Sequence, residues 1–330
     1  MSGGRAILRG ITIPMVTPMS APGRPDAEAG AELLAALHAA GADALMLLGS
    51  NGEGPLLPTS ALGDFVTDAT ARWRALGGGP VLVNVTAAGT DEALARASVV
   101  APATPDALVL SPPIYFHHRE DEIVAHYAAT AALGVPVIVY NAPRYSNPIT
   151  PAVFDALLAM DHVVGLKDSS GDAAWFAAAV AAAREHRPEF GISQGAEGQL
   201  LAGLRAGADG IVPGIANIAP AVAVALFRAW LTSASPESAE PATVDADQPE
   251  RWQAIIDRLC GVHTIRPGVP TIKEILSWGG LCPPHVAAPL QPCTDDERTA
   301  LRSYLEPLAS HLTSPTLTSP TPHLAHPPPR

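Results

Sequence analysis

The chain has 330 residues, of which 48% are apolar, so it can bury a large core, and one main domain is expected at this length. No apolar run approaches the ~20 residues that cross a bilayer, and residues 1–10 lack the apolar segment of a signal peptide, so we expect a cytoplasmic protein without a membrane span. The formal net charge of −12 argues against nucleic-acid binding through a basic surface.

Eight short apolar runs rich in β-branched residues alternate with Ala- and Leu-rich segments whose apolar residues have helical spacing. This alternation predicts β/α units and a parallel sheet. The predicted strands are Ile11–Val16, Ala44–Leu48, Val81–Val85, Ala107–Leu110, Val137–Tyr140, Val163–Lys167, Gly191–Gln194 and Gly210–Pro213, and the predicted helices include Ala29–Ala40, Asp91–Val100, Glu120–Ala132 and Ala173–Arg184. An open doubly wound sheet would give the same alternation, but eight units close naturally into a (β/α)8 TIM barrel, which we predict over residues 1–231.

The chain changes character after the eighth unit. Residues 232–250 are rich in Ser, Pro, Asp and Glu without apolar periodicity, which predicts an acidic flexible loop. Residues 251–310 are expected to form a helical extension packed on the barrel, with helices over Trp252–Leu259, Thr271–Leu276 and Asp295–Leu308. Residues 311–330, with their T-S-P-T repeats and terminal prolines, are predicted to be a disordered tail.

Lysine is scarce in this chain, which has 18 arginines but only Lys167 and Lys273. An amine can lose its proton and act as a nucleophile, whereas a guanidinium stays charged. Lys167 ends the sixth predicted strand, V-V-G-L-K, and so faces the end of the barrel where catalytic residues gather. The alternative is a lysine that reaches solvent or pairs with the adjacent Asp168.

Two further strand ends carry candidate residues. Tyr140 ends the fifth strand and should point toward the same mouth as Lys167, where a phenol can transfer protons, although a strand-end tyrosine often serves only in packing. The segment G-S-N-G-E, residues 49–53, follows the second strand. Its backbone N–H groups near a helix start would suit a carboxylate, but an ordinary turn with Ser50 or Asn51 as helix cap has the same pattern.

Other classes of site lack their motifs. His117 and His118 are adjacent, no histidine pair has metal-ligand spacing, and no G-x-S-x-G or G-x-G-x-x-G motif stands in the required place. Cys260, Cys282 and Cys293 are odd in number and lack C-x-x-C spacing, so reduced thiols are expected, with a disulfide between two of them as the alternative. We predict no metal site.

Taken in order, the strand-end motifs resemble those of the dihydrodipicolinate synthase and N-acetylneuraminate lyase family of pyruvate-type class I aldolases. The resemblance runs from about Gly10 to about Leu308 and covers I-P-M-V-T-P, G-S-N-G-E, S-P-P-I-Y, V-Y-N-A-P and V-G-L-K-D-S-S-G-D. It implies a Schiff-base enzyme without cofactor that acts on a small 2-oxo acid, as a homo-oligomer, either a dimer or a tetramer.

The resemblance also implies roles for individual residues. Lys167 matches the Schiff-base lysine and Tyr140 the general acid/base, while Ser50 stands where the family has the first threonine of G-T-T-G-E and keeps a relay hydroxyl. Tyr115 matches a relay tyrosine that the family often contributes from a neighbouring subunit. The N–H groups of Ser50 and Asn51 would hold the substrate carboxylate.

Two more matching positions, Gly195 and Val212, would line the pocket. The synthases of the family have an arginine at the position of Tyr145, and Arg144, one residue earlier, is expected to project differently. We therefore expect an aldolase or lyase for a small hydroxylated 2-oxo acid, of the 4-hydroxy-2-oxoglutarate or 2-keto-3-deoxy-sugar-acid type. A 4-hydroxy-tetrahydrodipicolinate synthase or related dehydratase is the alternative, and a non-catalytic binding barrel is a minor one.

Overall fold

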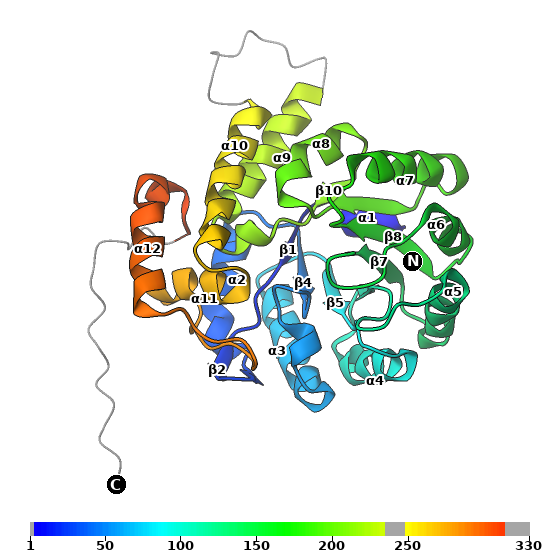
Figure 1. Ribbon diagram of the computed structural model, residues 1–330, viewed down its shortest axis with the longest axis horizontal. Coiled ribbons are helices and arrows are strands. Elements are labelled where there is room, and N and C mark those ends of the chain that lie inside the picture. Colours follow the sequence, from blue (N-terminus) through cyan, green and yellow to red (C-terminus); the bar gives the residue numbers. More distant parts are fainter. Residues whose placement is uncertain (1–2, 235–247, 314–330) are drawn as a thin grey trace.

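The computed structural model describes residues 3–234 and 248–313, and its centre is a closed barrel of eight parallel strands (Figure 1). Neighbouring strands follow the chain order, and β1 closes the ring between β10 and β4. The strands are β1 (Gly10–Pro14), β4 (Ala44–Leu47), β5 (Val81–Asn84), β6 (Ala107–Leu110), β7 (Val137–Asn141), β8 (Val163–Asp168), β9 (Gly191–Gln194) and β10 (Gly210–Ile211). The predicted barrel is confirmed and the open sheet is excluded. The eighth strand is shorter than predicted, because it ends at Ile211, two residues before Pro213.

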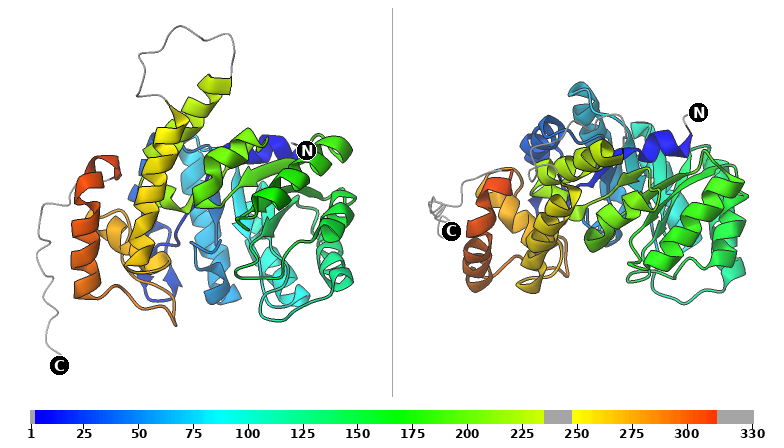
Figure 2. Two further views of the ribbon diagram at one scale, coloured as in Figure 1. Left: turned by 45° about the horizontal axis from the view of Figure 1, so that its top comes forward. Right: turned by 90° about the horizontal axis from the view of Figure 1, so that it is seen from above.

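Helices surround the barrel on the outside (Figures 1 and 2). They are α2 (Ala31–Ala39), α3 (Leu62–Ala75), α4 (Thr90–Val100), α5 (Glu120–Ala129), α6 (Pro151–Leu158), α7 (Ala173–His186), α8 (Leu200–Arg205) and α9 (Pro220–Ala234). Large side chains such as Trp73, Phe176 and Phe190 are buried in the main hydrophobic core. A second cluster, which includes Met46, Leu82 and Ile138, comes from alternate strand positions and fills the barrel interior.

Two elements at the start of the chain were not predicted. Helix α1 (Gly4–Leu8) packs against β8 and β9, with Leu8 fully buried. A Cβ at Gly4 would lie 1.7 Å from the carbonyl oxygen of Val164, so this close approach requires glycine. The hairpin of β2 (Met19–Ala21) and β3 (Arg24–Pro25) turns at Gly23, whose φ is +71°. Both elements are too short for periodicity to reveal them.

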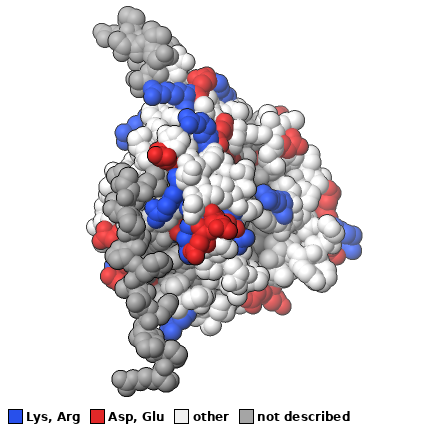
Figure 3. Space-filling view, turned by 60° about the vertical axis from the view of Figure 1, so that its left-hand side comes forward, with Lys and Arg blue, Asp and Glu red and all other residues white. Residues whose placement is uncertain are grey.

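The chain continues after the barrel with α10 (Pro249–Cys260), α11 (Val269–Trp278) and α12 (Asp295–Leu305). Helix α10 packs along α9, and α12 is followed by a 3-10 turn over Glu306–His311. The predicted acidic loop, 232–250, and tail, 311–330, lie mostly outside the described residues, and residues 232–234 belong to α9. Basic and acidic side chains are interspersed on the face that carries these helices (Figure 3).

Short 3-10 turns complete the described chain, at Glu28–Gly30, Gly54–Leu56, Thr59–Ala61, Ala101–Ala103, Thr130–Leu133, Glu197–Gln199, Gly214–Asn217 and Gly261–Thr264. Three of these turns lie just after strands, at the carboxyl end of the barrel. None of the helices described is long and apolar enough to cross a membrane.

Candidate active site

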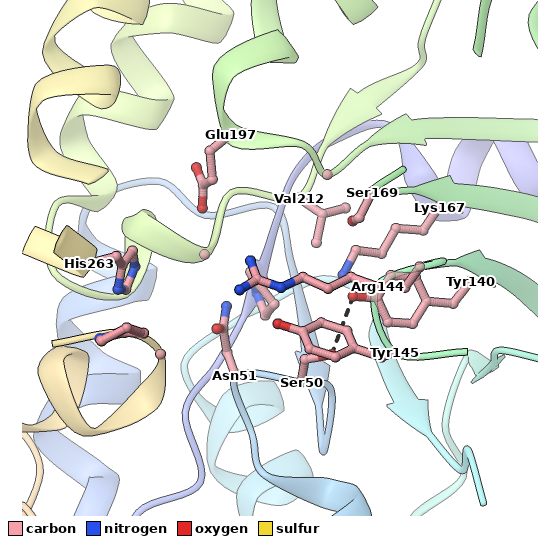
Figure 4. A pocket seen from close by; sticks show the side chains of 16 residues that line it. Ser50, Asn51, Tyr140, Arg144, Tyr145, Lys167, Ser169, Glu197, Val212 and His263 are labelled. Atoms are coloured by element: carbon pink, nitrogen blue, oxygen red, sulfur yellow. Dashed lines mark hydrogen bonds between the residues drawn. The ribbon is translucent and has the colours of Figure 1, made fainter. Parts of the chain in front are cut away.

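A cavity of about 510 Å³ lies at the carboxyl end of the barrel (Figure 4). Six of the seven residues predicted for the site line it, namely Ser50, Asn51, Tyr140, Lys167, Gly195 and Val212. They come from the ends of five strands, β4, β7, β8, β9 and β10, because parallel strands of a barrel all end at the same face. The barrel therefore brings together residues as far apart in sequence as Ser50 and Val212.

Lys167 stands in the wall of this cavity near the end of β8. Its backbone is paired with Tyr140 of β7 and Ser193 of β9, and only 5% of the residue is exposed. Its Nζ lies 4.1 Å from the centroid of the Tyr140 ring. The pairing with Asp168 considered as an alternative is absent, since the Asp168 side chain bonds Asn141 and Ser170 instead. Lys167 therefore lines the cavity beside Tyr140 and is not paired with Asp168.

Tyr140 connects the lysine to the turn after β4. The Tyr140 hydroxyl lies 3.3 Å from Ser50 Oγ. Burial raises the pKa of the phenol, but the charge of Lys167 and hydrogen bonds from Ser50 and Ser169 outweigh burial, so the pKa of Tyr140 lies below its ordinary value. A lowered pKa makes the phenol a stronger acid and brings its proton exchange closer to neutral pH, where general acid/base catalysis is most effective.

The turn after β4, residues 49–54, holds Ser50 and Asn51 toward the cavity. The Glu53 N–H donates to the carbonyl of Ser50, 3.2 Å, and Glu53 has a φ of +56°. A Cβ at Gly54 would lie 1.9 Å from the carbonyl oxygen of Leu48, so the turn closes only with glycine there. Neither the Ser50 nor the Asn51 N–H donates to another described residue, which leaves both available to an anion.

The second lysine, Lys273 of α11, supports this turn from behind. Lys273 and Glu53 form an ion pair of 2.5 Å, and their side chains are 0% and 1% exposed. Lys273 Nζ also donates to the carbonyl of His285, 2.7 Å, while Glu53 accepts the N–H of Ala287, 2.6 Å. Burial lowers the pKa of Lys273, and Glu53 opposes that shift. This lysine therefore joins the C-terminal helices to the turn and does not face the cavity.

Glu197 and His263 also line the cavity and were not found from the sequence (Figure 4). Glu197 follows β9, and its Oε1 accepts the Ile215 N–H, 2.9 Å, while Oε2 is buried without a partner among the described residues. Burial raises the pKa of Glu197 to about 7. His263, in the turn after α10, has a pKa lowered by burial, and its buried Nδ1 has no hydrogen-bond partner in the described part of the chain. Glu197 could have been found from the sequence, because it stands two residues after Gly195, which was predicted to line the pocket. No local sequence pattern predicts that His263 lies at the mouth of the barrel.

Arg144, which was expected to project differently from the arginine of the synthases, has its side chain in the cavity. Both Arg144 and Tyr145 line the cavity, and the Arg144 guanidinium points into the space between Asn51, Glu197 and His263 (Figure 4). The chain leaves the strand at Asn141 and turns, with the N–H of Tyr145 donating to the carbonyl of Ala142, 2.8 Å. Side-chain alternation along a strand does not hold inside such a turn.

Tyr115 is the one predicted site residue that does not line the cavity of its own chain. It is 86% exposed, has a φ of +86°, and meets the Phe116 ring edge-on with centroids 4.7 Å apart. A non-glycine residue at positive φ is strained. The predicted role of Tyr115 in a neighbouring subunit stays a prediction.

The cysteines and possible metal ligands form no further centre in residues 3–234 and 248–313. Cys260, Cys282 and Cys293 are free thiols, and burial raises the pKa of each, to about 12 for Cys282 and about 11 for Cys293. Within the same ranges no three His, Cys, Asp or Glu side chains are grouped closely enough to hold a metal ion.

Comparison with known proteins gives consistent matches over nearly the whole chain. The model of the dihydrodipicolinate synthetase family matches residues 7–308. An uncharacterized DapA-like lyase of Halobacterium salinarum is 31% identical over 316 residues, 93% of this chain and 96% of that protein. The 4-hydroxy-tetrahydrodipicolinate synthase of Salinibacter ruber is 32% identical over 300 residues, 90% of this chain and 93% of that enzyme.

A third relative has a solved structure. Escherichia coli YagE, a putative 2-dehydro-3-deoxy-D-gluconate aldolase, is 27% identical over 310 residues, 92% of this chain and 98% of YagE. The crystal structure of YagE in complex with pyruvate matches this fold with a TM-score of 0.81, covering 91% of this chain and 98% of that chain at 24% identity.

Proposed function

The chain belongs to the dihydrodipicolinate synthetase family, and from that premise we propose that Lys167 is the amine through which it forms an imine with a 2-oxo acid. Membership makes the protein a pyruvate-dependent aldolase or lyase of this family. The observation that carries the assignment of Lys167 is its place in the cavity, 4.1 Å from the Tyr140 ring, with the Tyr140 hydroxyl 3.3 Å from Ser50 Oγ.

The proposed reaction begins with attack of the Lys167 amine on the carbonyl carbon of the substrate. Loss of water gives a protonated imine, which accepts electrons better than the ketone. When a base takes the proton of the hydroxyl on C4, the C3–C4 bond breaks, an aldehyde leaves, and the electron pair stays on C3 as an enamine. Protonation of C3 and hydrolysis of the imine release pyruvate and restore the amine.

Two sets of groups assist these steps in our proposal. Tyr140, whose pKa is lowered, donates a proton to the departing carbinolamine oxygen and takes one from the C4 hydroxyl, with Ser50 as its relay partner. The N–H groups of Ser50 and Asn51 hold the substrate carboxylate and orient the carbonyl toward Lys167.

For the substrate we propose a 2-dehydro-3-deoxy sugar acid, cleaved to pyruvate and a hydroxyaldehyde. The cavity extends beyond Lys167 to Glu197 and His263, where Glu197 Oε2 and His263 Nδ1 are buried and have no partner among the described residues. A hydroxyl group can donate to one such atom and accept from the other, whereas a second carboxylate would be repelled by Glu197. The name of YagE agrees with this class.

Synthase activity is the second candidate, and Arg144 favours it. Its guanidinium lies in the cavity and could hold a second carboxylate, as the arginine at the position of Tyr145 is expected to do in the synthases. A 4-hydroxy-2-oxoglutarate substrate would use the same arginine. The Salinibacter ruber relative is a named synthase.

A substrate panel separates these candidates. Pyruvate release is followed with 2-dehydro-3-deoxy sugar acids and 4-hydroxy-2-oxoglutarate, and pyruvate consumption is followed with aspartate semialdehyde. We expect the sugar acids to give the highest kcat/KM, Glu197→Gln to lower that value by about tenfold, and Arg144→Gln to change it less. Turnover with aspartate semialdehyde alone, lost in Arg144→Gln, would establish the synthase.

We also propose that Tyr115 completes the relay of a second copy in a homo-oligomer. Its exposure and strained backbone would then be accounted for by an interface. Light scattering after size-exclusion chromatography gives the oligomeric state. A monomer in which Tyr115→Phe keeps full activity would remove this role.

A further inference from the structure

Directly behind the two central residues of the site lies a buried polar pair, Asn141 and Asp168. In the register of β7 and β8, Tyr140 is paired with Lys167 and Asn141 with Asp168. Successive side chains of a strand point to opposite faces, so Asn141 and Asp168 point away from the cavity. They are 2% and 0% exposed, and Asn141 Nδ2 donates to Asp168 Oδ1 over 2.7 Å.

The remaining polar atoms of the pair are also satisfied. Asn141 Oδ1 accepts the N–H of Ile149, 3.1 Å, and Asp168 accepts both the N–H and the hydroxyl of Ser170, 3.3 and 3.0 Å. No salt bridge to Asp168 occurs in the described part of the chain, so hydrogen bonds alone stabilise its charge. Burial accordingly raises the pKa of Asp168 to about 6.

The same two residues hold three loops that line the cavity. The carbonyl of Asn141 accepts the N–H of Ser169, 2.9 Å, and the carbonyl of Asp168 accepts the N–H of Gly195, 2.6 Å. Ser169 and Gly195 both line the cavity. The hydrogen bond from the Ile149 N–H to Asn141 Oδ1 fixes the far end of the loop between β7 and α6, and Ile149 is 2% exposed. This loop carries Arg144.

We propose that Asn141 and Asp168 are positioning residues, which set the distance between Lys167 and Tyr140 and the placement of the loop after β7. The inference rests on the proposed imine chemistry, although neither side chain touches the substrate. Because the hydrogen bond joins the strands one residue beyond the reacting side chains, its loss lets the strand ends separate. A displacement of about 1 Å between reacting groups can cost roughly 100-fold in rate.

The test exchanges the two groups. Asn141→Asp sets two carboxylates against each other and should slow formation of the pyruvate adduct and lower kcat by about 10- to 100-fold. Asp168→Asn keeps an acceptor for Asn141 and for the Ser170 N–H, and its NH₂ can donate to the Ser170 hydroxyl. This variant should stay within about threefold of the wild type. The double variant N141D/D168N restores an amide–carboxylate pair with its direction reversed and should recover most of the loss.

The readouts are the rate at which borohydride traps the pyruvate adduct on Lys167, the kcat and KM for substrate, and the midpoint of thermal unfolding. A matched control is Asp172→Ala. Asp172 is the N-cap of α7, and its carboxylate accepts the N–H groups of Ala174 and Trp175. The substitution should lower the melting midpoint and leave the adduct rate unchanged.

Two outcomes would overturn the proposal. One is a folded N141D variant whose adduct rate stays within about threefold of the wild type, and the other is a folded double variant no faster than N141D. If N141D does not fold, Asn141→Ala takes its place, with the same loss expected and the same outcomes decisive. Failure of the wild type to form any adduct at Lys167 would instead count against the proposed function.

Discussion

Replacing Lys273 with methionine is expected to destabilise the fold by about 3–5 kcal/mol, because the change leaves the Glu53 carboxylate buried without its partner. The two side chains are 0% and 1% exposed and 2.5 Å apart, so solvent cannot take over the role of the lost amine. The bond from Lys273 Nζ to the His285 carbonyl is lost as well. The turn that holds Ser50 should loosen at the same time.

The expected shift in melting temperature follows from the size of the chain. At roughly 2.1 cal/mol/K of unfolding entropy per residue, 330 residues give about 0.7 kcal/mol/K, so 3–5 kcal/mol corresponds to a fall of about 4–7 °C. Differential scanning calorimetry and urea titration measure the midpoint and the free energy of unfolding. The double variant K273M/E53Q removes both charges and should recover more than half of the loss.

A matched control separates burial from charge removal as such. Arg205 and Glu250 form an ion pair in which both side chains are about half exposed, so Arg205→Met should change the melting midpoint far less than Lys273→Met does. A Lys273→Met variant that loses no more stability than Arg205→Met would refute the argument from burial. A double variant less stable than K273M would refute the argument from the unpaired carboxylate.

Three substitutions probe the cavity and its surroundings. Tyr140→Phe should lower kcat by about 10²- to 10⁴-fold, while a slow pyruvate adduct still forms. Steady-state kinetics and borohydride trapping measure these two quantities, and an unchanged kcat would contradict the proposed role of Tyr140. Ser50→Ala removes a bond that lowers the pKa of Tyr140, so the alkaline limb of the kcat/KM profile should move to higher pH, and a fixed limb speaks against the relay. Asp168 has a pKa raised from 3.8 to about 6, so the folded chain holds this proton more tightly than the unfolded chain. Its carboxyl therefore makes the stability of the fold decrease as the pH rises from about 4 to about 6. The melting midpoint of Asp168→Asn, relative to that of the wild type, should therefore be higher at about pH 6 than at about pH 4. Melting curves recorded across this range test the difference, and a constant difference would contradict it.

Much of the barrel could be predicted because its strands are nearly continuous apolar runs. Parallel strands are buried on both faces and therefore consist of nearly continuous apolar residues. A polar residue at the end of such a run indicates the catalytic face of the barrel. Lys167 and Tyr140 both end runs of this kind, and the structure sets them in adjacent strands. The scarcity of lysine drew attention to both lysines, but only the structure separates them, since Lys273 meets a partner 220 positions away in the sequence, Glu53.

The rest of the site depends on contacts that local patterns do not encode. His263 reaches the cavity because α10 packs along α9, which carries the following turn to the barrel mouth. The place of Arg144 in the cavity could not be predicted from side-chain alternation, because the chain turns beyond the end of β7. The pairing of Asn141 with Asp168 depends on strand register, which the sequence of either strand alone leaves open.

Trapping the imine with borohydride shows directly whether Lys167 forms it. The protein is incubated with pyruvate and borohydride, digested, and searched by mass spectrometry for the reduced adduct, with Lys167→Arg as the control. Since Lys167 and Lys273 are the only lysines in the chain, the assignment has two lysine outcomes. We expect the adduct on Lys167 and none in the control. Label on Lys273, or equal label in the wild type and the control, would exclude Lys167 as the imine-forming residue.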